Sequence, residues 1–213
     1  VAVLGMALAA AGGRARADAV PPELSGEIAS RAARSGVPAE DLLAAVAEAA
    51  RRGAPADVVG SKVLEGLSKG VPPRQIAAAA RDLADRLLQA QAALDAAARG
   101  GIRPPADRRG AVADLASALG RGVDRPAVDA LVASARGGSA DQVVAVARAL
   151  GELSRRGVPV AESLPLGRTL AAHPGRAHAE LPSIYGAWRS EGGRDVRAFL
   201  EEAERRAASA RPL

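Results

Sequence analysis

The sequence predicts an all-α protein in which duplicated units of short antiparallel helices form a helical bundle or a short α-solenoid. Two observations lead to this prediction. Apolar residues recur at the three- and four-residue spacing of an amphipathic helix, and Gly-x-Pro tripeptides separate the periodic segments. The alternation of apolar and polar residues that is typical of a strand does not occur.

Three Gly-x-Pro tripeptides begin at residues 36, 53 and 70, so the glycines are 17 residues apart. A glycine just past a helix adopts the left-handed conformation easily, and a proline fits the first position of the next helix. About 13 residues remain for each helix, which must pack on its neighbours because so short a helix is marginal alone. The expected caps are Gly36, Gly53, Gly70, Gly122, Gly138 and Gly157, with Pro38, Pro55, Pro72 and Pro159.

Glycine also occurs inside the predicted helices, as at Gly60. A left-handed cap at Gly70 predicts that Gly70→Ala costs about 1 kcal/mol, whereas Gly60→Ala is expected to be neutral or stabilising.

The spacing of the glycines recurs later in the chain. Gly122, Gly138 and Gly157 follow the first three glycines by 86, 85 and 87 residues, and several apolar positions align. We interpret this as an internal duplication of a helical unit of roughly 86 residues. The alternative is chance recurrence in a chain rich in glycine and proline.

The expected organisation has four parts. Residues 1–19 are a signal peptide, and residues 20–99 form a first helical unit that ends in a long helix from residue 73. The Gly/Pro/Arg-rich segment 100–110 is a linker, and residues 111–213 form a second unit with aromatic residues in its C-terminal helices. Pro165 and Gly167 predict an interrupted helix in this second unit.

The signal-peptide prediction comes from an apolar stretch over residues 1–11 and small-x-small patterns at 15–17 and 17–19. Eleven apolar residues are too few for a permanent transmembrane helix. The sequence therefore predicts export to the periplasm or the medium, and the alternative is an ordinary N-terminal helix.

The tripeptides Gly36-Val37-Pro38, Gly70-Val71-Pro72 and Gly157-Val158-Pro159 resemble those of uncharacterised exported bacterial proteins, in which Gly-Val-Pro or Gly-Leu-Pro separates helices. The resemblance covers about residues 24–165. It implies export and a helical fold, and it brings no activity with it.

Composition limits the function classes. The chain has no cysteine, which excludes disulfides and cysteine-ligated zinc. It has no phosphate-loop, nucleophile-elbow or metalloprotease motif, so we expect no cofactor and no catalytic residue. The net charge is +5. Binding to an anionic polymer such as nucleic acid or an envelope glycan is an alternative function, although we do not expect nucleic acid because basic runs and interleaved aromatics are missing.

One candidate ligand surface lies near the C-terminus, where a histidine pair precedes an aromatic pair. Tyr185 and Trp188 are three residues apart and share a helix face, either as core anchors or as a stacking surface. The two histidines, with Pro-Gly between them, are expected on a loop, and Glu180 is a possible third metal ligand. The candidate residues are His173, His178, Tyr185, Trp188 and Arg189. The preferred function is a non-enzymatic interaction with another protein through a helical groove, and an enzyme at the histidine pair is a further alternative.

Overall fold

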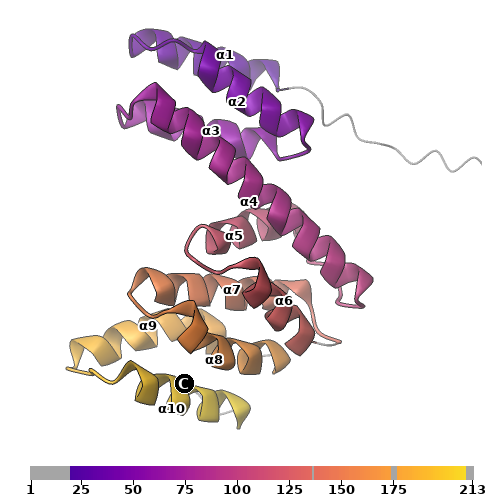
Figure 1. The fold of residues 1–213 in the computed structure, drawn as a ribbon, viewed down its shortest axis with the longest axis vertical. Helices are drawn as coiled ribbons and strands as arrows, with labels where there is room; N and C mark the ends of the chain where they lie inside the picture. Colours follow the sequence, from indigo (N-terminus) through magenta and orange to yellow (C-terminus); the bar gives the residue numbers. More distant parts are fainter. Residues whose placement is uncertain (1–19, 136, 174–176, 210–213) are drawn as a thin grey trace, which may run out of the picture.

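The computed structural model describes residues 20–135, 137–173 and 177–209, and these residues confirm the all-α prediction. They form ten helices and no strand; one isolated parallel bridge joins Arg103 to Ser139. Figure 1 shows the helices in chain order. Their bounds are α1 Pro22–Arg34, α2 Glu40–Arg51, α3 Ala56–Ser68, α4 Pro73–Arg99, α5 Arg108–Leu119, α6 Arg125–Ser134, α7 Ala140–Arg155, α8 Val160–Ala172, α9 Ala177–Ser190 and α10 Val196–Ala208.

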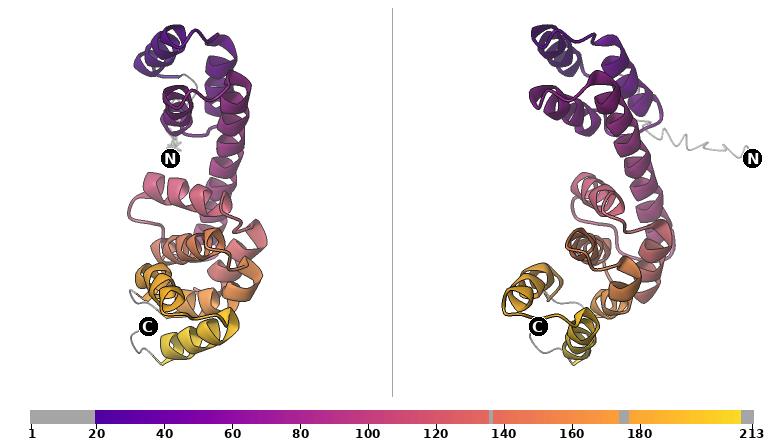
Figure 2. Two further views of the ribbon diagram at one scale, coloured as in Figure 1. Left: turned by 90° about the vertical axis from the view of Figure 1, so that its left-hand side faces the viewer. Right: turned by 60° about the vertical axis from the view of Figure 1, so that its left-hand side comes forward.

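The helices stack in two layers. In one layer α1 packs on α3, and α5 and α9 pack on either side of α7. In the other layer α2, α4, α6, α8 and α10 follow one another, each in contact with the next. Figure 2 shows the resulting curved column, with α1 and α2 at one end and α9 and α10 at the other. The protein is therefore a short two-layer solenoid.

The core between the layers consists of the predicted apolar stripes. Leu42 and Val46 of α2 and Val59 and Val63 of α3 are fully buried. Along α4 the stripe from Ile76 to Leu94 is buried except at Leu83, which is half-buried. Many of the other core residues are alanines, which let the helix axes approach closely.

Five of the ten helices, α1, α2, α3, α5 and α7, end in the predicted glycine stop. Gly36, Gly53, Gly70, Gly122 and Gly157 all have positive φ. At Gly70 the glycine N–H donates to the carbonyl of Leu67 (3.2 Å), and the next N–H, of Val71, donates to that of Gly66 (3.0 Å). The same two bonds recur at the other four glycines, which identifies the Schellman motif.

One predicted cap is wrong. The left-handed glycine between α6 and α7 is Gly137 (φ 74), whereas Gly138 is not left-handed. Gly138 instead lies in the short bridge to residue 103, where its carbonyl accepts from the N–H of Arg103 (3.1 Å). In a Gly-Gly pair the sequence does not distinguish the two, because either residue tolerates the left-handed region. With Gly137 the middle offset becomes 84 residues, and the internal duplication stays a prediction.

The prolines lie earlier than predicted. Pro55, Pro72 and Pro159 are N-cap residues with extended ψ angles of 104°, 137° and 138°, and not the first helical residues. Pro38 lies two residues before the start of α2. The fixed φ of proline suits an N-cap as well as a first turn, and its carbonyl can still accept the first helical hydrogen bond. For example, the N–H of Ile76 donates to the carbonyl of Pro72 (3.1 Å).

The predicted interruption of the helix at Pro165 and Gly167 is also wrong, because α8 runs without a break through both. Proline removes only one hydrogen bond there, and packing on α6, α7 and α10 holds the helix. Gly167 is buried for a packing reason: a Cβ built on it lies 2.8 Å from Leu150 and 3.2 Å from Leu131.

The segment predicted as a linker joins α4 to α5. Ile102 within it is buried, and the N–H of Ala106 lies 3.2 Å from the carboxylate of Asp141 in α7. The long helix α4 contacts α2 and α3 near one end of the column and α5 and α6 beyond them. The division into two units stays a prediction.

Gly60 lacks the open surroundings that a neutral or stabilising alanine substitution requires. It is buried where α3 crosses α1, and a Cβ built on it lies 2.6 Å from Leu24. The glycine therefore allows the two helices to approach.

Three glycine-to-alanine variants separate these roles. Gly70→Ala is expected to lose about 1 kcal/mol of unfolding free energy, because alanine is strained at positive φ. Gly60→Ala is expected to lose stability because Leu24 must move. Gly26→Ala, on the exposed face of α1 with open space around its Cβ, is expected to gain up to about 1 kcal/mol.

Urea unfolding of the three variants measures these differences. A Gly70→Ala protein as stable as Gly26→Ala would contradict the glycine stop.

Candidate functional site

The three aromatic residues of the chain form one cluster at the C-terminal end of the column. Tyr185 and Trp188 of α9 have ring centroids 5.7 Å apart, which confirms that they share a helix face. Phe199 of α10 reaches both, at 5.3 Å from Tyr185 and 5.0 Å from Trp188. Tyr185 is a core residue with 3% exposure, and Trp188 is half-buried and packs against the core. The role of the pair as a stacking surface stays a prediction.

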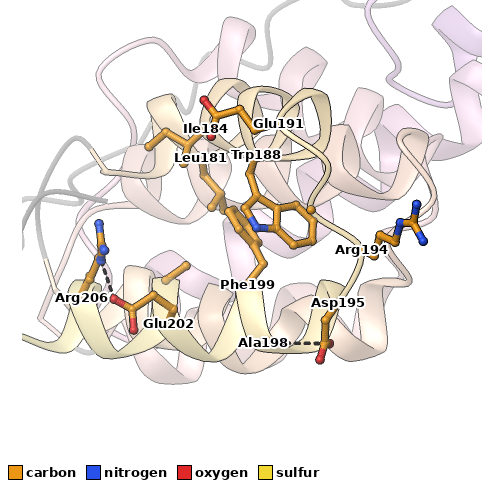
Figure 3. A pocket seen from close by; sticks show the side chains of 12 residues that line it. Leu181, Ile184, Trp188, Glu191, Arg194, Asp195, Ala198, Phe199, Glu202 and Arg206 are labelled. Atoms are coloured by element: carbon orange, nitrogen blue, oxygen red, sulfur yellow. Dashed lines mark hydrogen bonds and ion pairs between the residues drawn. The ribbon is translucent and has the colours of Figure 1, made fainter.

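A groove runs between α9 and α10 beside this cluster, with a volume of ≈ 650 Å³. We call it the terminal groove. Figure 3 shows Trp188 and Phe199 at its centre, with Leu181 and Ile184 of α9 beside them. Charged side chains surround this apolar floor: Glu191, Arg194 and Asp195 on the connecting turn, and Glu202 and Arg206 on α10.

The turn between the two helices fixes the indole of Trp188. Gly192 is left-handed (φ 93), and the N–H of Gly193 donates to the carbonyl of Trp188 (3.0 Å). A Cβ built on Gly193 would overlap the indole ring of Trp188. The backbone at residue 193 therefore lies against the ring, and only glycine fits at this position. Arg189 is one of the residues of the predicted ligand surface. Its Nη1 donates to the carbonyl of Gly193 (3.0 Å), so Arg189 holds the same turn.

Charges on the α10 side of the groove are neutralised within the helix. Arg206 donates to Glu202 (2.6 Å), and this bond, together with the charge of Arg205, lowers the pKa of Glu202. Asp195 caps α10 by accepting from the N–H of Ala198 (3.1 Å). Glu191 and Arg194 are both exposed, and neither side chain makes a hydrogen bond or an ion pair with another residue that the structure describes. These two charges are thus available to a partner.

The histidine pair lies partly outside the described residues. His173 is the C-cap residue of α8, just after Ala172, and its Nδ1 lies 2.9 Å from the carbonyl of Thr169. The prediction of a loop is wrong for His178, whose backbone belongs to α9, and its side chain lies outside the described residues. Glu180 is exposed on α9. Among the side chains that the structure describes, no three His, Asp or Glu residues gather as metal ligands.

Many arginines pair with carboxylates on neighbouring helices or turns of the same helix. Arg148 of α7 reaches Asp114 of α5 (3.0 Å), and Arg121 reaches Glu152 (3.3 Å). Arg109 also pairs with Asp57, which joins α5 to α3. Each of these arginines is neutralised by a nearby carboxylate. They therefore do not form a basic surface patch, although the chain has a positive net charge.

Sequence reasoning found Tyr185 and Trp188 but missed Phe199, Leu181 and Ile184. Phe199 was visible as the third aromatic, but its contact with Trp188 depends on the turn that folds α10 back beside α9. Within the described part of the chain, none of the helices combines the length and the apolar character that crossing a bilayer requires.

Comparison with protein-family models, curated proteins and solved structures finds no match to this chain.

The position of Trp188 gives a spectroscopic prediction, since it is the single tryptophan. Gly193→Ala forces the indole out of its present place, so the emission maximum and the acrylamide quenching of Trp188 are expected to change. Gly26→Ala, at the other end of the column, leaves both unchanged. Identical spectra for Gly193→Ala and the wild type would contradict the packing of the indole on the turn.

Proposed function

We propose that this protein is an exported bacterial interaction protein without catalytic activity, and that it binds another protein molecule through the terminal groove. The observation that supports this proposal is the half-exposed Trp188 in an apolar groove between two helices, flanked by unpaired charges. Tryptophan and arginine are the residues most enriched at the energetic centres of protein interfaces.

The shape of the terminal groove suits a helical segment of the binding partner. Two roughly parallel walls, α9 and α10, leave an apolar floor between them, and an amphipathic helix places its apolar side chains in such a groove at i, i+3, i+4 and i+7. The charged margin sets orientation rather than affinity. The charged side chains stand at the margin and the floor is apolar, which favours an amphipathic partner over a small polar substrate.

Export is part of the proposal. It is supported by the apolar segment and the small-x-small patterns of residues 1–19, which lie outside the described residues. The periplasm and the extracellular medium are the compartments in which the interaction would take place.

A synthetic amphipathic helix tests the groove. The probe carries leucine at i, i+3, i+4 and i+7 between alternating Lys and Glu, and it lacks aromatic residues. Its binding is expected to shift Trp188 emission to shorter wavelength, to saturate with concentration, and to reduce acrylamide quenching, because the indole leaves water.

Ala198→Arg supplies the blocked variant, because Ala198 lines the groove and is exposed. Ala133→Arg, at an exposed position of α6, is the matched control and is expected to bind like the wild type. No saturable change in the wild type, or equal binding by Ala198→Arg, would contradict the proposal.

Fractionation of the native host tests export. Mass spectrometry of the N-terminus is expected to find a mature chain that starts near Asp18 or Val20 in the periplasmic or extracellular fraction. A cytosolic chain that retains residues 1–17 would contradict export and leave the groove proposal intact.

A further inference from the structure

The two ends of the column differ in the side chains that they expose. At the α1–α2 end the exposed side chains of both helices are charged or small, for example Glu23, Glu27 and Arg34. At the α9–α10 end the terminal groove presents Trp188, Phe199 and Ile184. A stack of helices needs a polar outer face at each end to stay soluble as a monomer. The exposed charges of α1 provide such a face at the first end, where Leu24 and Leu43 are half-buried against the core. At the second end the apolar floor of the terminal groove opens between the helices.

The unpaired charges of the terminal groove have opposite signs. Glu191 and Arg194 flank the Gly192-Gly193 turn, three positions apart, and both are exposed. Neither side chain makes a hydrogen bond or an ion pair with the residues in the described ranges. A surface that carries an apolar centre and one free charge of each sign complements itself, because a two-fold axis brings each charge opposite its counterpart.

We infer that the partner covering the terminal groove is the α9–α10 end of a second copy of this chain, in a two-fold symmetric dimer. This inference rests on the proposed function, since it names the partner of the same site. Trp188 and Phe199 of the two copies form the apolar centre. Arg194 of each copy pairs with Glu191 of the other.

The polar α1–α2 end determines the symmetry. A head-to-tail contact would bury the apolar floor of the groove against the exposed charges of α1, such as Glu23, Glu27 and Arg34. The contact of two α9–α10 ends covers the apolar floor of the groove on both copies. The symmetry is therefore closed, and association stops at two chains.

Sedimentation velocity of the full chain over a concentration series tests the dimer. The wild type is expected to pass from monomer to dimer without larger species. Trp188 emission is expected to move to shorter wavelength over the same range. Ala198→Arg is expected to remain monomeric, and Ala133→Arg is expected to dimerise like the wild type.

Charge reversal tests the pairing. Arg194→Glu and Glu191→Arg are each expected to raise the dissociation constant about tenfold, because each places like charges opposite one another. An equimolar mixture of the two variants restores the affinity, since both cross-pairs are then of opposite sign. Arg74→Glu, at an exposed arginine of α4 without an ion pair in the described part of the chain, leaves dimerisation unchanged. Circular dichroism verifies that each variant is folded.

A chain that stays monomeric at every concentration, or that grows beyond dimers, would overturn the inference. A mixture that associates no better than the single variants would also overturn the pairing. A monomer that still binds the amphipathic probe contradicts the dimer alone. A monomer that does not bind the probe contradicts the proposed function as well.

Discussion

The structure depends on the close approach of short helices, which small residues make possible. Most helices here have 10 to 16 residues, and such helices are marginal without neighbours. Glycine and alanine at the crossings let their backbones approach. A Cβ built on Gly151 of α7, for example, lies 3.3 Å from the Cα of Ala118 in α5. Because each helix is stabilised mainly by the next, the fold is a stack and its stability is a sum of neighbouring contacts.

The glycine stops also help the short helices to pack closely, because they shorten the connections between them. A Schellman motif ends a helix within two residues and satisfies two carbonyls, so the chain turns quickly into the next helix. The residue after the glycine then returns to the core, as Val123 and Val158 do. Short, tightly turned helices with small contact residues leave little space for large side chains inside the column.

Large aromatic side chains therefore collect where the stack ends. No further helix among the described residues covers α9 and α10 from outside, so Trp188 and Phe199 fill the space between them and remain partly exposed. This arrangement stabilises the last two helices and at the same time leaves an apolar surface. The interaction surface is thus a consequence of how the stack ends.

The sequence alone predicted the helices, most left-handed glycines and the core stripes, because these follow from local spacing and backbone preference. It placed the cap at Gly138 where the structure has Gly137, because either residue of a Gly-Gly pair tolerates the left-handed region. It also predicted a break at Pro165 and Gly167, because the packing that holds α8 together there is not visible in the sequence. Trp188 was identified as a candidate. The groove was not, since it requires α10, which packs on α8, to return beside α9.

The measurement that tests the account most directly is hydrogen–deuterium exchange of the full chain with and without the saturating amphipathic helix. If the terminal groove is the interaction surface, added protection is confined to peptides that cover α9, the Gly192-Gly193 turn and α10. Protection along α1 to α4, or no change in α9 and α10 at saturation, would contradict the account.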